Sequence, residues 1–321
     1  MVILLSSYER LRHSWAGWRV GTTTTLTLIA APRGGMRELA DVHTVGVVGA
    51  GTMGSGIAQV AATNGYEVLL RDVDQAALAD GAESIQDSLD RFVRKDRFTD
   101  SEAASIRDRI ATTTDLQALA DCDLVVEAVV EALDVKQEVF AELDEICADG
   151  VVLASNTSTL SVTSIASVTD REPLVVGLHF MNPVPLMPGV ELVVGEKTAT
   201  RTVAVANGFA ESLEKETWQS DDKPGFVVNR VLIPWGCEGI RAFDEGVAPK
   251  ADIDRGLKLG TNVPMGPLEL ADHIGLDICL NAAETLHEEL GDRYKPPYLL
   301  RRKVEAGDLG KKSGQGFYEY D

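Results

Sequence analysis

Cysteine is scarce in this 321-residue chain, and its four cysteines stand far apart. They form no CxxC pair and no cluster with histidine, a pattern that is not typical of a disulfide framework or a zinc site. We therefore expect reduced thiols, a cytoplasmic protein and no bound metal. The cysteines are Cys122, Cys147, Cys237 and Cys279.

Long hydrophobic runs are lacking as well. No apolar run approaches the ~20 residues that a membrane-spanning helix needs. The apolar segment Val2–Leu5 is followed at once by Glu9 and Arg10, which is not the order of a secretory signal. We expect no membrane association, and we expect residues 1–40 to form a poorly ordered extension, with Met36 as a more natural start.

Positive charge is the third shortage. Lysine and arginine number 30 against 50 aspartate and glutamate residues, which leaves a net charge of −20. Such a chain is poorly suited to bind nucleic acids or anionic membrane surfaces. A small anionic ligand would need local basic groups or helix N-termini. The length favours two domains, and a hydrophobic content of 45% is typical of a globular protein.

A glycine-rich turn near the start is the most distinctive motif. The β-branched run Thr44–Val48 breaks into Gly49-Ala-Gly-Thr-Met-Gly54 and then into a helical pattern. In a dinucleotide-binding turn the first glycine allows the bend, the second admits a pyrophosphate, and the third lets helix and strand pack closely. The residues expected to hold NAD are Gly49, Gly51, Thr52, Met53 and Gly54.

An acidic residue follows this turn at the distance that the fingerprint expects. Asp72 ends the second strand-like run, Glu67–Asp72, about 20 residues beyond the glycines. A carboxylate there accepts hydrogen bonds from a ribose 2′-hydroxyl and repels a 2′-phosphate, which favours NAD over NADP. The neighbouring Arg71 argues weakly in the other direction.

Strand and helix patterns alternate over the first two thirds of the chain. Buried-strand runs such as Val151–Ala154 and Leu174–Gly177 alternate with helical periodicities. Right-handed βαβ units predict an α/β fold with a Rossmann-like, mostly parallel, doubly wound sheet over 41–221. Beyond Asp221 the pattern is helical, which predicts an all-α C-terminal domain over 222–321.

Two polar loops follow strands of this expected sheet. Ser155-Asn-Thr-Ser-Thr159 comes after one strand, and Leu178–Pro185, with its prolines, comes after the next. Ligands bind at the carboxyl ends of such strands. A lone histidine is more often structural than catalytic. His179, one of five histidines, meets a polar loop and has the carboxylate of Glu191 nearby in sequence, so we favour a functional role.

Several motifs resemble those of the L-3-hydroxyacyl-CoA dehydrogenase family, on its bacterial 3-hydroxybutyryl-CoA branch. They occur in the expected order from residue 44 to the C-terminus. The motifs are Gly-Ala-Gly-Thr-Met-Gly (49–54), Ser-Asn-Thr-Ser (155–158), Gly-Leu-His-Phe-Met-Asn-Pro-Val-Pro (177–185), Pro-Gly-Phe-Val-Val-Asn-Arg (224–230), Pro-Met-Gly-Pro-Leu-Glu-Leu (264–270) and Lys-Lys-Ser-Gly-Gln-Gly-Phe-Tyr (311–318).

The resemblance implies NAD-dependent oxidation of the 3-hydroxyl of an (S)-3-hydroxyacyl-CoA, or the reverse reaction, in fatty acid or butanoate metabolism. His179 would be the general base, and Glu191 would orient it and stabilise its protonated form. Ser158 and Asn229 would hydrogen-bond the substrate oxygen.

The same resemblance assigns further contacts and a homodimer formed through the C-terminal domain. Near the cofactor it implies Glu131, Lys136, Asn182 and Lys312, and near the CoA moiety Ser88 and Lys95 together with Ser158.

Three alternatives stay open at this point. The substrate could be a free 3-hydroxy acid of the carnitine or gulonate type, or a dicarboxylic 3-hydroxyadipyl-CoA. The chain could also bind a nucleotide without turnover. The acyl chain length is not set by the sequence.

Overall fold

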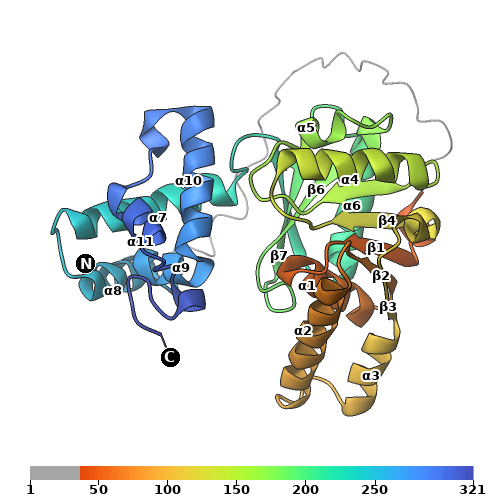
Figure 1. Cartoon of the computed structure of the whole chain (residues 1–321), viewed down its shortest axis with the longest axis horizontal. Coiled ribbons are helices and arrows are strands. Elements are labelled where there is room, and N and C mark those ends of the chain that lie inside the picture. Colours follow the sequence, from red (N-terminus) through yellow and green to blue (C-terminus); the bar gives the residue numbers. More distant parts are fainter. Residues whose placement is uncertain (1–36, 321) are drawn as a thin grey trace, which may run out of the picture. The chain divides into compact units, whose positions relative to one another are not determined.

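An eight-stranded sheet runs through the N-terminal part of the protein (Figure 1). The computed structural model describes residues 37–320. The strand order is β3-β2-β1-β4-β5-β6-β7-β8. Strands β1 to β6 are parallel, β7 runs antiparallel to β6, and β8 runs parallel to β7. The strands are β1 (Thr44–Val48), β2 (Glu67–Arg71), β3 (Ile110–Thr113), β4 (Leu124–Glu127), β5 (Val152–Ser155), β6 (Val175–Phe180), β7 (Gly189–Val194) and β8 (Glu216–Asp221).

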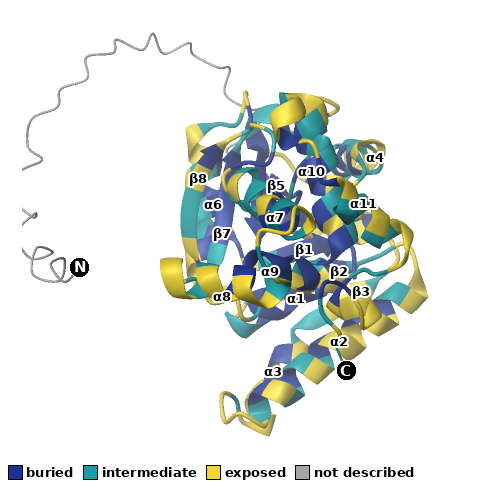
Figure 2. Cartoon of the chain, turned by 90° about the vertical axis from the view of Figure 1, so that its left-hand side faces the viewer, coloured by how far each residue is buried: buried dark blue, intermediate teal, exposed yellow. Residues whose placement is uncertain are grey.

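Helices cover both faces of the sheet, and each face has its own apolar core. One core collects side chains from α1, α2, α3 and α6, and the other from α4 and α5. Strands β4, β5 and β6 are buried throughout, whereas the edge strands β3 and β8 are only partly buried. In Figure 2, β7 is accordingly dark blue and its edge neighbour β8 is teal. The helices are α1 (Thr52–Thr63), α2 (Gln75–Val93), α3 (Asp100–Asp108), α4 (Leu133–Ile146), α5 (Val162–Ala166) and α6 (Thr200–Ser212).

The expected fold class is confirmed: the sheet is mostly parallel and doubly wound. Helix α2 shows why the periodicity was a reliable guide, since Leu78, Ile85 and Leu89 fall on one face and are all buried. Lys95, one of the residues that the resemblance assigns to the CoA moiety, lies past the end of α2, in the turn that leads to α3.

The start of the described chain is tied to the sheet. Residues 1–36 of the expected extension lie outside the described range, whereas residues 37–40 belong to ordered structure. The guanidinium of Arg37 forms an ion pair with Asp123, and its backbone N–H donates to the carbonyl of Gly150. The extension predicted over residues 1–40 therefore lies mostly outside the described residues, and only its last four residues can be placed.

Beyond β8 the chain is helical, with an apolar core of its own. Among residues 37–320 no helix is long and apolar enough to cross a membrane. The helices are α7 (Val228–Asp244), α8 (Lys250–Thr261), α9 (Pro267–Ile274), α10 (Leu276–Leu290) and α11 (Tyr298–Glu305), and short 3₁₀ turns stand at Leu39–Asp41, Leu116–Asp121, Glu172–Leu174, Asp292–Tyr294 and Lys311–Ser313.

All four cysteines are buried free thiols. Burial raises the pKa of Cys122 and Cys279 to about 12. It raises the pKa of Cys147 and Cys237 to about 11. Each thiol therefore stays protonated at neutral pH.

The glycine-rich C-terminal segment is pinned by a buried carboxylate. Asp272, which is 1% exposed, accepts hydrogen bonds from the backbone N–H groups of Phe317 and Tyr318, both at 2.8 Å, and from the Tyr320 hydroxyl at 3.1 Å. A Cβ at Gly316 would collide with this carboxylate, so the glycine is required for the close approach. The motif at 311–318 thus has a structural role in addition to any contact with a ligand.

We expect Asp272→Ala to lower the free energy of unfolding by about 3 kcal/mol, because buried donors to a charged acceptor would lose their partner. Urea unfolding followed by circular dichroism measures the change. Asp292→Ala, at a side chain that is 98% exposed in the same helical part, should leave the midpoint almost unchanged. Equal effects of the two changes would contradict this role.

Candidate active site at the carboxyl edge of the sheet

The glycine turn between β1 and α1 has room for a ligand where the fingerprint requires it. Gly49 has a φ of 103°, and a Cβ there would lie 2.5 Å from the carbonyl oxygen of Ala128. A Cβ at Gly54 would run into the carbonyl of Gly49. At Gly51, in contrast, a Cβ would meet nothing within 4 Å. The first and third glycines are required by the fold, while the second borders open space.

The N-terminus of α1 opens onto that space. Its N-cap is Gly51, which provides no side-chain cap, so the first N–H groups of the helix can bind an anion. Asp72 borders the same turn, and its Oδ2 accepts a hydrogen bond of 2.7 Å from the N–H of Ala50. A diphosphate at the helix end and a ribose near Asp72 fit this arrangement.

The β6–β7 pairing brings His179 and Glu191 face to face. The two residues are direct partners in the antiparallel register, and His179 Nδ1 lies 3.1 Å from Glu191 Oε2. Glu191 is fully buried and His179 is 7% exposed. The other carboxylate oxygen accepts a hydrogen bond of 2.7 Å from the N–H of Val227. Burial raises the pKa of Glu191, but the hydrogen bonds from His179 and Val227 outweigh it and hold that pKa below its ordinary value.

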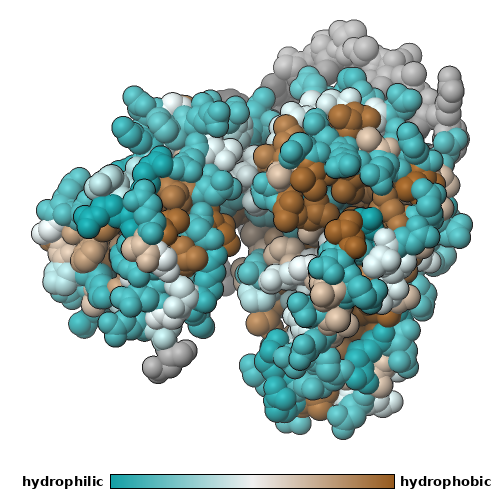
Figure 3. Space-filling model, viewed as in Figure 1, coloured by the Kyte–Doolittle hydropathy of each residue, from teal (hydrophilic) through white to brown (hydrophobic). Residues whose placement is uncertain are grey.

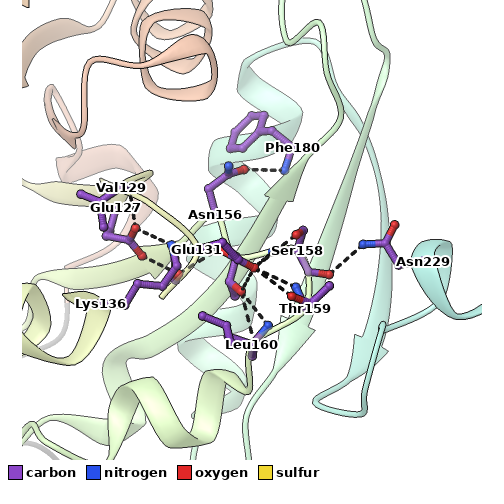
Figure 4. Close-up of polar contacts among 12 residues, drawn as sticks. Glu127, Val129, Glu131, Lys136, Asn156, Ser158, Thr159, Leu160, Phe180 and Asn229 are labelled. Atoms are coloured by element: carbon purple, nitrogen blue, oxygen red, sulfur yellow. Dashed lines mark hydrogen bonds and ion pairs between the residues drawn. The ribbon is translucent and has the colours of Figure 1, made fainter. Parts of the chain in front are cut away.

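A second carboxylate organises the loop that follows β5. Glu131 Oε1 accepts hydrogen bonds from the N–H groups of Ser158 and Thr159, at 2.8 and 3.0 Å, and from the Thr157 hydroxyl at 2.7 Å. Burial raises the pKa of Glu131, but the charge of Lys136 and these donors lower it by more, so that the pKa lies below its ordinary value. The loop is therefore wrapped around an ionised carboxylate (Figure 4).

The start of α7 contacts both groups of candidate residues. Asn229 Nδ2 donates to the carbonyl of Ser158 at 2.9 Å (Figure 4). Two residues earlier, Val227 donates to Glu191, and the ring of Phe226 packs beside that of His179 with centroids 6.1 Å apart. The four residues expected to be catalytic thus form two pairs, His179 with Glu191 and Ser158 with Asn229, that are joined through residues 226–229.

The other expected ligand contacts are spread more widely. Ser88 is half-buried on α2, Lys95 is exposed beyond its end, and Asn182 is exposed before a cis peptide bond to Pro183. Lys312 lies in the helical part, where its Nζ is 2.6 Å from Asp277 Oδ2. Lys136 is 1% exposed and paired with carboxylates.

Sequence reasoning missed the side chains that fix the loops in place. Lys215 is buried, and its Nζ donates to the carbonyls of Val184 and Met187, both at 2.8 Å, which anchors the proline-rich loop after His179. Burial lowers the pKa of Lys215. Asn156 Oδ1 accepts from the N–H of Phe180 at 2.9 Å. From the sequence alone, Lys215 would be expected at the surface, because lysines that precede a strand are usually exposed.

Asp222, which was assigned only to the domain boundary, caps α5. Its Oδ1 accepts from Val162 N at 3.0 Å, and its Oδ2 accepts from Thr163 N and the Ser161 hydroxyl, both at 2.7 Å.

Glu127 could have been found from the sequence, because a carboxylate at the end of an apolar strand is unusual. It is fully buried, and its oxygens accept from Lys136, Val129 and Ser155.

We expect Glu131→Gln to lower the free energy of unfolding at pH 7 and to lose this effect in acid. A carboxyl whose pKa is lowered by folding stabilises the protein fully above its unfolded pKa, near 4.5, and loses that contribution as pH falls through the folded value. Denaturant unfolding of both proteins between pH 7 and pH 3 measures the difference. A gap between wild type and variant that stays constant below pH 4.5 would contradict the assignment.

Comparison with known proteins identifies the family. The model of the 3-hydroxyacyl-CoA dehydrogenase NAD-binding domain matches residues 44–222, and that of the 3-hydroxyacyl-CoA dehydrogenase C-terminal domain matches residues 225–320. The chain is 49% identical over 276 residues to a probable 3-hydroxybutyryl-CoA dehydrogenase of Deinococcus radiodurans, which covers 86% of this chain and 99% of the relative. It is 42% identical to the human mitochondrial hydroxyacyl-coenzyme A dehydrogenase, over 87% of this chain and 91% of that protein.

Solved structures agree with this assignment. The crystal structure of (S)-3-hydroxybutyryl-CoA dehydrogenase PaaH1 from Ralstonia eutropha matches with a TM-score of 0.83 and 43% identity, and the match covers 88% of this chain and all of that one. FadB2 of Mycobacterium tuberculosis matches with a TM-score of 0.86 and 44% identity, over 87% and 99% of the two chains. The protein therefore belongs to the 3-hydroxyacyl-CoA dehydrogenase family, with that family's NAD-binding domain in its N-terminal part.

Proposed function

We propose that this dehydrogenase acts on (S)-3-hydroxybutyryl-CoA, with His179 and Glu191 as its general base pair. The observation that carries the proposal is the buried contact between His179 Nδ1 and Glu191 Oε2, at 3.1 Å, at the edge of a nucleotide-binding sheet. Relatives that are 46% to 49% identical carry the name 3-hydroxybutyryl-CoA dehydrogenase, which supports the substrate.

The two ring nitrogens of His179 have separate tasks in this proposal. Nδ1 faces Glu191, so Nε2 is the atom that takes the proton from the substrate's C3 hydroxyl. Glu191 is held ionised and stabilises the imidazolium that forms. Bound NAD supplies the acceptor for the hydride that leaves C3. In the reverse direction Nε2 returns the proton to the substrate oxygen.

Ser158 and Asn229 bind the substrate oxygen on which charge develops. The Ser158 backbone is held on one side by Glu131 and on the other by Asn229, and its hydroxyl donates to Glu131 Oε1 at 3.2 Å. The CoA moiety contacts Ser88 and Lys95 at the far end of α2. The exposed cations of the following turn favour a polyphosphate in an otherwise acidic chain.

The remaining cofactor contacts follow from the same arrangement. Gly49, Gly51, Thr52, Met53 and Gly54 hold the diphosphate and Asp72 the adenosine ribose. We assign Asn182 and Lys312 to the nicotinamide end and Glu131 to a further cofactor contact. Lys136, expected near the cofactor as well, is buried and paired with Glu127 and Glu131, so it acts only through them.

We also propose a cytoplasmic homodimer of two-domain chains, divided at Asp221–Asp222, that works in fatty acid or butanoate metabolism. Apolar side chains on the helical part support the dimer, because Val231, Leu259 and Tyr298 are 68%, 76% and 72% exposed. Figure 3 shows apolar groups gathered on this part of the surface. Protonated free thiols are compatible with the cytoplasm.

His179→Gln should lower kcat by roughly 10²- to 10⁴-fold, the usual contribution of a positioned general base, while NADH still binds. Initial rates with acetoacetyl-CoA and NADH fluorescence titration measure the two effects. His43→Gln, at an exposed histidine outside the site, is the matched control and should keep wild-type kcat. Unchanged turnover in His179→Gln would exclude this mechanism.

Acetoacetyl-CoA should be reduced at least roughly 100-fold more efficiently, as kcat/KM, than free acetoacetate, because the CoA moiety contributes binding energy far from C3. The oxidation of NADH measures both. Similar values would favour a free 3-hydroxy acid as the substrate. A 3-oxoadipyl-CoA assay beside it addresses the dicarboxylic alternative.

A further inference from the structure

A chain of three charged side chains lies beneath the serine loop (Figure 4). Glu127 is the last residue of β4, and Lys136 lies in the first turn of α4. Glu131 lies between them in sequence. Glu127 is fully buried, and Lys136 is 1% exposed. The side chain of Glu131 is 26% exposed, so the chain runs from the interior toward the site.

Every oxygen of Glu127 has a donor. Oε1 accepts from Lys136 Nζ at 2.6 Å and from the N–H of Val129 at 2.7 Å, and Oε2 accepts from the Ser155 hydroxyl at 2.6 Å. A buried carboxylate is tolerated only when it is paired and hydrogen-bonded in this way. Glu127 thus fixes both the head of Lys136 and the first residue of the Ser155–Thr159 loop.

Lys136 is shared unequally between the two carboxylates. Its Nζ lies 2.6 Å from Glu127 Oε1 and 3.4 Å from Glu131 Oε2. The shorter contact keeps the Lys136 ammonium next to Glu127. Glu131 Oε1 is therefore not bound to the ammonium and points toward the loop. That oxygen receives the N–H groups of Ser158 and Thr159. The position of Ser158 therefore depends on where Lys136 is held.

We propose that Glu127 is a positioning residue of the active site: it retains Lys136 at the distance at which Glu131 organises the Ser158 loop. Lys136 then acts through the two carboxylates, since its ammonium is buried. Without the charge of Glu127, the ammonium would move fully onto Glu131 and compete with the loop N–H groups for its oxygens. The effect on turnover depends on the proposed role of Ser158, whereas the effect on the loop does not.

The test is a double-mutant cycle of Glu127→Gln, Lys136→Met and their combination. Glutamine keeps the shape of Glu127 and removes its charge. We expect Glu127→Gln to lower kcat roughly tenfold, with KM for acetoacetyl-CoA within about threefold of wild type, and the double variant to be no slower than Lys136→Met, as for residues that act through one contact. Independent, multiplicative losses in the cycle would overturn the proposal.

Hydrogen exchange separates this proposal from the function itself. The amides of Ser158 and Thr159 should exchange at least about tenfold faster in Glu127→Gln, because their acceptor is disturbed. Unchanged exchange would overturn the proposal, whatever the activity. If the wild-type protein fails to reduce acetoacetyl-CoA while the amides respond as expected, the proposed substrate fails and the positioning role stands.

Asp144→Asn is the matched control for general destabilisation. Asp144 lies at the other end of α4, and its carboxylate binds Arg171, with side chains that are 17% and 10% exposed. This change removes a partly buried, ion-paired carboxylate from the helix that carries Lys136. It should lower the midpoint of thermal unfolding while kcat and the exchange of Ser158 stay unchanged. If Asp144→Asn lost as much kcat as Glu127→Gln, general destabilisation would explain both losses, and the positioning role of Glu127 would be overturned.

Discussion

The antiparallel pairing of β6 and β7 is the constraint on which the site depends. Were β7 parallel to β6, as β5 is, its residues would meet β6 in another register and order. The reversal makes His179 and Glu191 direct neighbours. Because both belong to central strands, neither can move without breaking the ladder. The backbones of both residues are therefore as rigid as the sheet, whereas their surroundings are held by side chains from loops and helices.

Those surroundings use buried charges as anchors. Lys215 holds the proline-rich loop by two carbonyls, Glu131 gathers the serine loop, and Asp222 caps α5. Each charge binds backbone groups that would otherwise lack partners, and charge-assisted hydrogen bonds are the strongest available for the purpose. A few buried charged side chains thus fix the conformation of loops that are not held by regular secondary structure.

The sequence was a good guide to the sheet, whereas the chemical roles of His179, Glu191, Ser158 and Asn229 stay predictions. The helical spacing of Leu78, Ile85 and Leu89 predicted α2. The glycine turn and Asp72 predicted where the cofactor binds. The pairing of His179 with Glu191 was predicted from the resemblance, but its geometry was not, because the direction of β7 follows from tertiary packing. Lys215 and Asn156 gave no signal either, since their partners are backbone atoms distant in sequence. Ser158 and Asn229, 71 residues apart, were linked by resemblance alone.

The protonated state of the four thiols has a chemical consequence for a protein that handles thioesters. A thiolate near an acyl-CoA could attack its carbonyl and capture the acyl group, and it could form a mixed disulfide with free CoA under oxidising conditions. With pKa values raised to about 11 and 12 by burial, Cys122, Cys147, Cys237 and Cys279 offer almost no thiolate at neutral pH. The cysteines therefore do not attack the thioester of the substrate, and the reaction is confined to C3.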